Sequence, residues 1–252
     1  MKRFLSRVAL ITGGASGIGR AAAIGFAREG AHAVIVDLNG EQAAAVVEEI
    51  RSQGGCASAR QADAASEEAI SSVVHETVSE FGRLDIAFNN VGFGGAPLPL
   101  HEMHVERWDA VMNLCLRGCW LAMKHELRAM MAGAGGVIVN TASMAGVRVT
   151  STAPADYAVA KAGVLHLTRY AAEAYAACNI RVNSVSPGLT ATPAVSRTLT
   201  IEQQQAHAAR SQLFARAALP EEIAASVLFL CSDEAAMITG TNMEVCGGKI
   251  GG

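Results

Sequence analysis

Short apolar runs alternate with longer helical patterns along most of the chain. The runs are continuous rather than alternately apolar and polar, which is typical of strands covered on both faces in a parallel sheet. We expect strands at Val8–Ile11, His32–Val36, Ala57–Gln61, Leu84–Asn89, Gly136–Thr141, Ile180–Ser186 and near Asn242–Val245.

Amphipathic patterns with helical spacing separate these runs. We expect helices at Ala15–Glu29, Gly40–Gln53, Ser66–Phe81, a pair around Val105–Ala132, Asp156–Ala177, Ile201–Phe214 and Glu221–Cys231. This order predicts an α/β fold in which helices cover both faces of a parallel sheet. Because no linker, repeat or low-complexity segment divides the chain, we expect a single domain over residues 1–252.

The composition excludes several classes of protein. Hydrophobic residues make up 51% of the chain and charged residues 17%, so a sizeable core can form. The net charge of −3 and the absence of a Lys/Arg-rich run argue against a nucleic-acid partner. No apolar stretch reaches the roughly 18 residues of a membrane helix. The first ten residues run straight into a strand, so we expect no signal peptide.

The six cysteines form no C-x-x-C pair and have no metal-ligand spacing with histidine. We therefore expect reduced thiols in a cytoplasmic protein and no bound metal.

A glycine-rich turn, Thr12–Gly19, links the first strand to the first helix. Glycines let backbone N–H groups approach a pyrophosphate, and the helix N-terminus adds a partial positive charge. Glycine-rich loops also occur in ordinary turns. A phosphate-binding turn is favoured here because a strand precedes the loop, a helix follows it, and Asp37 ends the second strand.

Asp37 lies 18 positions after Gly19, near the spacing of a carboxylate that binds the adenosine ribose hydroxyls. A carboxylate there repels a 2′-phosphate. Leu38 and Asn39 supply no cation, and Ser16 occupies the turn where a basic residue could meet the phosphate. The sequence therefore favours NAD over NADP; the alternative is that Asp37 is a plain turn residue.

Tyr157 and Lys161 are four residues apart on a predicted helix and therefore share one face. An adjacent ammonium favours the phenolate, so Tyr157 can exchange a proton near neutral pH. Ser143 follows the strand Gly136–Thr141, at the edge of a parallel sheet that faces a cofactor crevice, and can donate to the same substrate oxygen. Taken alone, a Tyr–Lys pair with this spacing is usually a pair of exposed surface residues without a catalytic role.

Together these motifs resemble the short-chain dehydrogenase/reductase family in its compact single-domain branch. The resemblance spans nearly the whole chain and extends to Asp63, Asn89–Gly92, Arg181–Asn183 and Pro187–Gly188. It implies a Rossmann-type doubly wound parallel sheet of about seven strands, with hydride transfer between NAD and an alcohol or ketone. It also implies a homotetramer, for which the helices around Val105–Ala132 and Asp156–Ala177 are the expected interfaces.

The resemblance implies roles residue by residue. Tyr157 is the general acid/base, Lys161 assists it and binds the nicotinamide ribose, and Ser143 holds the substrate oxygen. The implied cofactor-binding set is Gly13, Ser16, Gly17, Ile18, Gly19, Asp37, Leu38, Asp63, Ala64, Asn90, Val91, Gly92, Tyr157, Lys161, Pro187, Gly188, Leu189, Thr190 and Thr192.

Cys115 is the main departure from the family pattern. The family commonly has an Asn seven positions after a Trp in this helix, and from Trp108 that position is Cys115. Asn113 is two positions off, and residues at i and i+2 do not share a helix face. Because a thiol is a poor substitute for a carboxamide in hydrogen bonding, we expect a weakened proton relay from Lys161.

Three segments, residues 93–100, 144–154 and a loop insertion near 189–214, are expected to line the substrate pocket. Apart from Arg148 and Arg197 they are mostly uncharged, and they offer Phe93, Leu98, Met144, Val147, Val149, Leu189, Leu213 and Phe214. A small to medium apolar secondary alcohol or ketone, alicyclic or steroid-like, fits best. The alternatives are a 3-oxoacyl-thioester reductase of the same family and a catalytically weak NAD-binding sensor or scaffold.

Overall fold

A seven-stranded sheet in the order β3-β2-β1-β4-β5-β6-β7 forms the centre of the computed structural model, which describes residues 2–149 and 153–248. The strands are β1 (Val8–Thr12), β2 (His32–Asp37), β3 (Cys56–Gln61), β4 (Ile86–Asn89), β5 (Gly136–Thr141), β6 (Ile180–Pro187) and β7 (Asn242–Val245). Every neighbouring pair is parallel. The strand order reverses between β1 and β4, the point at which doubly wound sheets bind ligands. The predicted fold class is confirmed.

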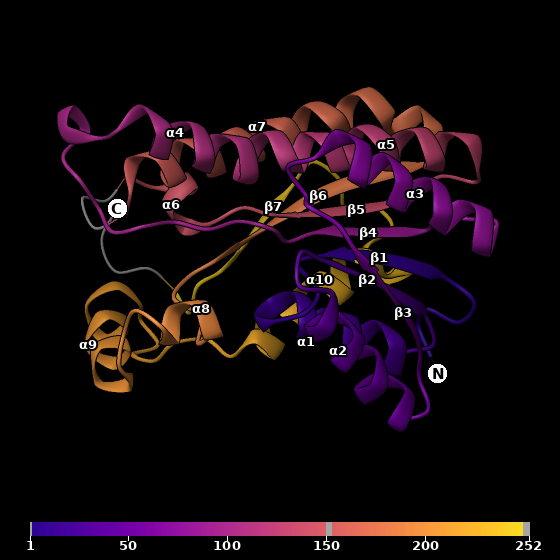
Figure 1. Ribbon diagram of the computed structural model, residues 1–252, viewed down its shortest axis with the longest axis horizontal. Coiled ribbons are helices and arrows are strands. Elements are labelled where there is room, and N and C mark those ends of the chain that lie inside the picture. Colours follow the sequence, from indigo (N-terminus) through magenta and orange to yellow (C-terminus); the bar gives the residue numbers. More distant parts are fainter. Residues whose placement is uncertain (1, 150–152, 249–252) are drawn as a thin grey trace.

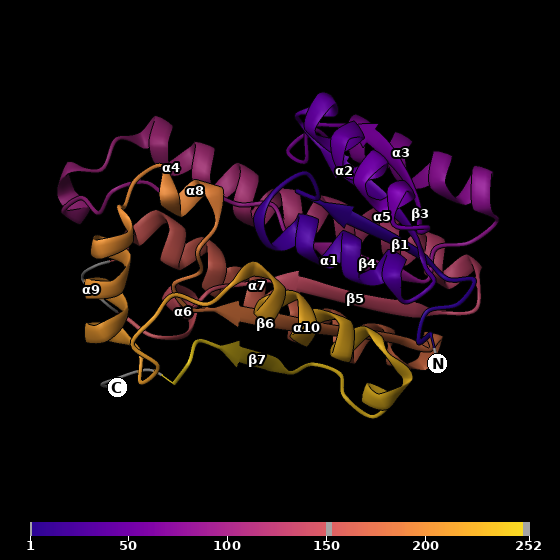
Figure 2. The same cartoon turned by 90° about the horizontal axis from the view of Figure 1, so that it is seen from below.

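Helices cover both faces of this sheet (Figures 1 and 2). On one face lie α1 (Gly17–Arg28), α2 (Gly40–Ser52) and α10 (Pro220–Cys231). On the other lie α3 (Glu67–Phe81), α4 (Val105–Met112), α5 (Gly118–Ala132) and α7 (Ala155–Tyr175). The short helix α6 (Met144–Val147) follows β5, and α8 (Pro193–Ser196) and α9 (Ile201–Ser211) follow β6. In the described part of the chain, no helix is long and apolar enough to cross a membrane.

The alternation of side chains along β1 explains why its sequence is apolar throughout. Ala9 and Ile11 pack into the core formed with α1, α2 and α10. Val8 and Leu10 point to the opposite face and pack into the core formed with α3, α5 and α7. Successive residues of a strand face opposite sides of a sheet, so a strand between two helical layers needs apolar residues at every position.

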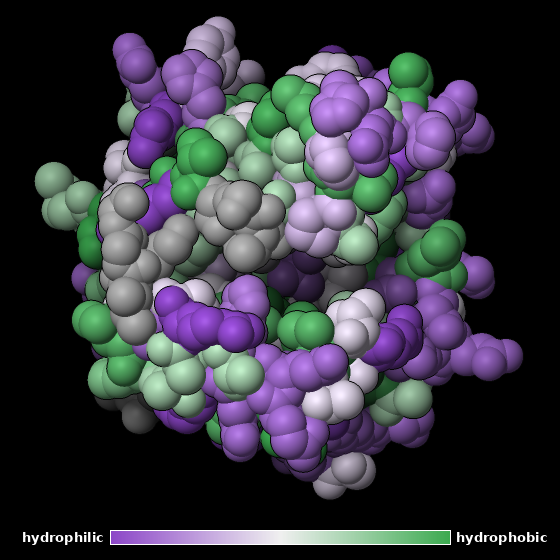
Figure 3. Space-filling model, turned by 90° about the vertical axis from the view of Figure 1, so that its left-hand side faces the viewer, coloured by the Kyte–Doolittle hydropathy of each residue, from purple (hydrophilic) through white to green (hydrophobic). Residues whose placement is uncertain are grey.

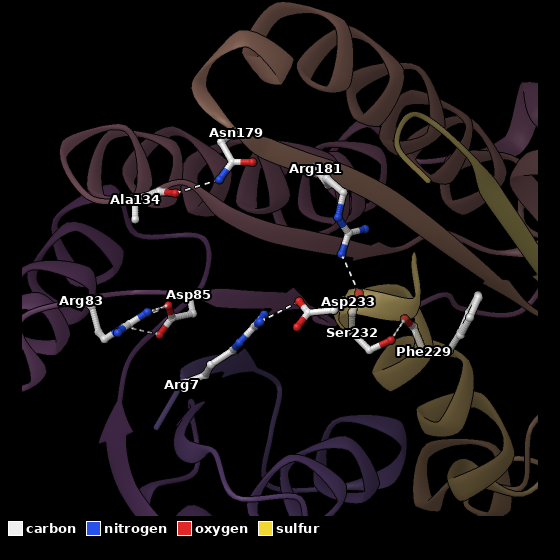
Figure 4. Close-up of polar contacts among 9 residues, drawn as sticks. All are labelled: Arg7, Arg83, Asp85, Ala134, Asn179, Arg181, Phe229, Ser232 and Asp233. Carbon is white, nitrogen blue, oxygen red and sulfur yellow. Dashed lines mark hydrogen bonds and ion pairs between the residues drawn. The ribbon is translucent and has the colours of Figure 1, made fainter. Parts of the chain in front are cut away.

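The amino-terminal edge of the sheet is closed by polar contacts between loops (Figure 4). Arg181 of β6 donates to the carbonyl oxygen of Ser232 at 3.1 Å, and Arg7, just before β1, pairs with Asp233 at 2.7 Å. These contacts fasten the end of α10 beneath the sheet. The hollowed face of the protein lies at the opposite edge, where the strands end.

Two predicted helices differ from those observed. The pair around Val105–Ala132 is one continuous helical stretch, because a π-helical segment, Asn113–Arg117, joins α4 to α5. The helix predicted to reach Phe214 ends at Ser211, since Gln212 is extended and the N–H groups of Leu213 and Phe214 donate to the carbonyls of Gly248 and Gly247.

A buried polar network lies between the sheet and helices α5 and α7. Glu126 of α5 is fully buried, and its Oε2 accepts a hydrogen bond from Asn89 Nδ2 at 2.9 Å. Asn89 Nδ2 also donates to Asn140 Oδ1 at 3.0 Å, and Asn140 Nδ2 donates to Thr168 Oγ1 at 3.0 Å. Burial raises the pKa of Glu126 to about 7, although the contact with Asn89 works in the other direction.

Replacing Glu126 should change how stability depends on pH. The carboxyl keeps its proton up to about pH 7 in the folded protein but ionises at its ordinary value of 4.5 when unfolded. The contribution of Glu126 to the free energy of unfolding is therefore fully present below about pH 4.5. It is lost as the pH rises through 7, and the loss is on the order of 3 kcal/mol. Glu126→Gln keeps an acceptor for Asn89 and should remove this loss, so its free energy of unfolding should exceed that of the wild type at pH 8.

Urea denaturation of the wild type and Glu126→Gln at several values between pH 5 and pH 8 measures this difference. Glu68→Gln, at an exposed position of α3, is the matched control. Equal pH slopes for the wild type and Glu126→Gln would show that Glu126 does not titrate in this range.

Candidate active site

A cleft of about 530 Å³ lies at the carboxyl ends of the strands. Figure 3 looks onto this edge of the molecule and shows the hollow near the middle of the face. The lining of the cleft includes all but one of the catalytic and cofactor-binding residues that the sequence nominated, namely Gly13, Ser16, Gly17, Ile18, Asp37, Leu38, Asp63, Ala64, Asn90, Val91, Gly92, Ser143, Tyr157, Lys161, Pro187, Gly188, Leu189, Thr190 and Thr192. Residues from six strand ends, those of β1 to β6, therefore meet in one place.

The glycine-rich turn forms one end of this cleft. Gly13 and Gly17 have φ angles of +64° and +52°, a left-handed conformation that favours glycine. Gly19 is the nominated residue that is absent from the described lining. It lies buried beneath the turn, where a Cβ would overlap the carbonyl oxygen of Gly13. Its role in the structure is close packing of the turn against α1.

Asp37 is held at the rim of the cleft beside this turn. Its Oδ2 accepts a hydrogen bond from the backbone N–H of Ala15 at 3.1 Å, and its Oδ1 accepts one from Asn39 at 3.0 Å. These contacts fix the carboxylate between the end of β2 and the start of α1. A carboxylate in this place can accept hydrogen bonds from ribose hydroxyls and repels a phosphate.

The other end of the cleft holds Ser143, Tyr157 and Lys161. Lys161 is 2% exposed, and its Nζ donates to the carbonyl oxygen of Thr141 at 2.7 Å. The same Nζ lies 5.7 Å from the centroid of the Tyr157 ring. Ser143 caps α6, where its Oγ accepts a hydrogen bond from the Ala145 N–H at 3.2 Å. A hydroxyl, a phenol and an ammonium thus share one pocket.

A nicotinamide dinucleotide suits this cleft in volume and in chemistry. The turn has no Cβ at Gly13 or Gly17, so its backbone N–H groups are accessible to a pyrophosphate. Asp37 stands at one end to receive hydroxyl groups, and the Lys161 ammonium stands at the other.

Cys115, in the π-helical segment, replaces the expected Asn and bonds to the loop after β4. It is fully buried; its Sγ accepts a hydrogen bond from the Phe93 N–H at 3.4 Å and donates to the Phe93 carbonyl at 3.3 Å. Burial raises the pKa of the Cys115 thiol, against the opposing effect of the Lys161 ammonium, so the thiol keeps the proton it donates. As expected, Asn113 faces elsewhere, and its Oδ1 accepts a hydrogen bond from Arg117.

A second, small cavity of about 10 Å³ lies behind Lys161. Cys115 and Thr141 line it, as does Asn89, whose Oδ1 has no hydrogen-bond partner within residues 2–149 and 153–248. This volume is close to the least that a single water position needs.

The substrate segments are placed partly as expected. Phe93 and Leu189 line the cleft. In contrast, Met144 is buried, Val147 packs against Val164 and Leu165, and Leu213 and Phe214 are more than two-thirds exposed. Val149 and Leu98 are also exposed and are absent from the described lining, and residues 150–152 of the second segment lie outside the described residues.

Sequence reasoning did not nominate Leu114, which lines the cleft, and it covered Val195 and Thr198 only as part of the segment 189–214 without naming them. Val195 lies on α8, a helix that the sequence signals locally. Thr192 is its N-cap and accepts a hydrogen bond from the Val195 N–H, and Pro193 occupies the first helical position. Thr followed by Pro is a typical helix start. Leu114 has no such signal, because its direction depends on the π-helical segment.

Comparisons with known proteins agree with this fold. A family model described as enoyl-(acyl carrier protein) reductase matches residues 13–249. The chain is 40% identical to cyclohexanol dehydrogenase of Acinetobacter sp. (strain SE19), over 97% of this chain and 95% of that protein. It is 41% identical to cis-4-hydroxycyclohexanecarboxylate dehydrogenase of Sinomonas cyclohexanicum, over 97% of each. A short-chain type dehydrogenase/reductase from Mycobacterium marinum superposes with a TM-score of 0.92 at 29% identity, over 97% of this chain and 95% of that one.

The chain belongs to the short-chain dehydrogenase/reductase family of oxidoreductases, as its motifs indicated.

The Cys115 contact should position the loop that begins at Phe93. Cys115→Ala removes both sulfur hydrogen bonds and leaves the Phe93 N–H and carbonyl unpaired. Losing one such contact costs about 0.5–1.5 kcal/mol, so KM for the alcohol should rise roughly two- to tenfold while NADH affinity stays unchanged. Steady-state kinetics and NADH fluorescence measure the two constants. Cys115→Ser, which retains a donor and an acceptor, is the control; a KM for Cys115→Ala equal to that of the control would refute the positioning role.

Proposed function

We propose that this protein is an NAD-dependent dehydrogenase that interconverts apolar secondary alcohols, in particular those on an alicyclic ring, and their ketones. One observation carries the proposal: Ser143, Tyr157 and Lys161 line the same cleft as the Asp37 carboxylate. The two relatives above are named cyclohexanol dehydrogenase and cis-4-hydroxycyclohexanecarboxylate dehydrogenase. These names support an alicyclic secondary alcohol as the substrate class.

NAD, when bound, supplies the acceptor for the hydride that leaves the carbinol carbon. The Ser143 hydroxyl donates a hydrogen bond to the substrate oxygen and orients it. Tyr157 takes the hydroxyl proton during oxidation and returns it during reduction. The Lys161 ammonium stabilises the phenolate form of Tyr157 and is held in place by Thr141. The other nominated lining residues hold the cofactor, with the glycine turn at its pyrophosphate.

The lining explains the preference for an apolar substrate. Phe93, Leu114, Leu189 and Val195 contribute hydrocarbon to the lining of the cleft. The charged residues of the described lining are Asp37, Asp63 and Lys161, all of which have proposed roles towards the cofactor. A second candidate function is the reduction of acyl thioesters, and the description of the matching family model is the observation that supports it.

We further propose a cytoplasmic homotetramer of single-domain subunits, with the substrate loop near residues 189–214. All six cysteines are free, which suits a reducing compartment. An apolar groove of about 710 Å³ runs between the α4–α5 stretch and α7, and Trp120 and Tyr170 on its rim are 44% and 68% exposed. A second copy of the chain is the occupant that the family suggests for this groove.

Cofactor choice tests the role of Asp37. NADH should bind at least about tenfold more tightly than NADPH, a difference of about 1.4 kcal/mol, because the carboxylate repels a 2′-phosphate. Asp37→Ser should weaken NADH binding and reduce the difference between the NADH and NADPH affinities. Fluorescence titration with both cofactors measures these affinities, and equal or tighter binding of NADPH by the wild type would contradict the assignment of NAD as the cofactor.

Tyr157→Phe tests the acid/base. The variant keeps the ring but loses the oxygen, so NADH should still bind while kcat for cyclohexanol falls roughly 10²–10⁴-fold. Loss of less than tenfold, with chemistry rate-limiting, would place the proton transfer on another residue.

A panel of secondary alcohols, ketones and 3-oxoacyl thioesters distinguishes the candidate functions. Turnover of thioesters alone favours the thioester reductase, and cofactor binding with no turnover favours a sensor.

A further inference from the structure

An ion pair outside the catalytic set lies directly beside Tyr157. Asp156, the residue before Tyr157, is fully buried, and its Oδ2 accepts a hydrogen bond from Arg107 Nε of α4 at 2.9 Å. Arg107 Nη2 lies 3.5 Å from Asp156 Oδ1, so the guanidinium faces the carboxylate with its planar fork. A buried carboxylate that lost such a partner would remain as an uncompensated charge.

The pair is connected on both sides to the site. Arg107 Nη2 donates to the carbonyl oxygen of Ala96 at 2.8 Å. Asp156 Oδ1 accepts the backbone N–H of Tyr157 at 2.8 Å. One line of contacts therefore runs from the loop after β4, through Arg107 and Asp156, to the first turn of the helix that carries Tyr157.

That loop is a wall of the substrate pocket. Phe93 and Gly94 line the cleft. A Cβ on Gly94 would lie 3.2 Å from Cγ of Tyr157, and one on Gly95 would lie 3.1 Å from Arg107 Nη2, so the loop rests on both the phenol ring and the guanidinium. Cys115 fastens it at Phe93 and Arg107 fastens it at Ala96.

The charge of Asp156 also acts inside the site. Within residues 2–149 and 153–248, the charged groups placed beside Tyr157 are Lys161 and Asp156 of α7 and Arg107 of α4. The Cys115 thiol comes from the π-helical segment, Arg148 follows α6, which packs against α7, and residues 93–99 bring no charge. Asp156 contributes to the raised pKa of the Cys115 thiol, after burial and against Lys161. An anion in this place disfavours the phenolate of Tyr157 unless a cation compensates it.

We infer that Arg107 is a positioning residue of the proposed dehydrogenase: it neutralises Asp156 beside Tyr157 and holds the loop of residues 93–99 as a wall of the substrate pocket. The inference rests on the proposed function, in which Tyr157 is the base that accepts the alcohol proton. It assigns two separable effects to one side chain, one through charge and one through the hydrogen bond to Ala96.

Three variants separate these effects, with NAD⁺ and cyclohexanol as the assay pair. Arg107→Met removes both, so KM for cyclohexanol should rise about fivefold or more, and the pH at which kcat/KM is half-maximal should move up by about one unit. Arg107→Lys retains the charge but loses the planar fork, so KM should rise while the pH midpoint stays near that of the wild type. Arg107→Met with Asp156→Asn removes the buried charge altogether, and the midpoint should return towards the wild-type value while KM remains high.

A second readout needs no turnover. Tyrosinate absorbance titration of the wild type, corrected with Tyr157→Phe, follows the Tyr157 phenol itself, and its midpoint should shift upward in Arg107→Met alone. This keeps the two proposals distinguishable, because a wild type that oxidises no alcohol would refute the proposed function and leave the titration valid. Unchanged midpoints in Arg107→Met, by both readouts, would overturn the inference. If Arg107→Met does not fold, a midpoint in Arg107→Lys that differs from the wild type by a full unit would also overturn it.

Discussion

The hydrogen bond from the Lys161 ammonium to the carbonyl oxygen of Thr141 fixes α7 against the end of β5. Because Lys161 is almost completely buried, its charge needs an acceptor, and Thr141 supplies one at the last residue of the strand. Ser143 lies two residues beyond that carbonyl, and Tyr157 lies one turn before Lys161 on the helix. One contact between a strand end and a helix therefore sets where the hydroxyl, the phenol and the ammonium meet.

The parallel sheet makes this convergence useful, since all its strands end at the same edge. The glycine turn after β1 and the Asp37 carboxylate at the end of β2 reach the cleft for the same reason that Ser143 does. Behind this edge, the fully buried network of Asn89, Asn140 and Glu126 joins β4, β5 and α5. Polar residues in the core hold the strand ends in register, while the apolar positions around them stabilise the two helical layers.

The fold class and most of the lining could be predicted because their signals are local in the sequence. The strand before the glycine turn, the acid after the second strand and the Tyr157–Lys161 spacing each lie within one element or its boundary. The pairing of Arg107 with Asp156 spans 49 residues and leaves no such pattern. Glu126 resembles an ordinary polar helix residue until the sheet covers it, and the helix predicted to reach Phe214 ended early because its apolar continuation pairs with the residues after β7. Cys115 lies in a π-helical segment, which a pattern with the α-helical period does not predict.

We propose that one cleft holds a nicotinamide dinucleotide between Asp37 and Lys161, beside the Tyr157 phenol. A crystal structure of the protein with NADH and a non-reacting ketone analogue tests this most directly. We predict the adenosine ribose hydroxyls against the Asp37 carboxylate, the nicotinamide ribose against Lys161, and the ketone oxygen within hydrogen-bond distance of both Ser143 Oγ and the Tyr157 hydroxyl. A dinucleotide bound away from Asp37, or a ketone oxygen that contacts neither hydroxyl, would contradict the account.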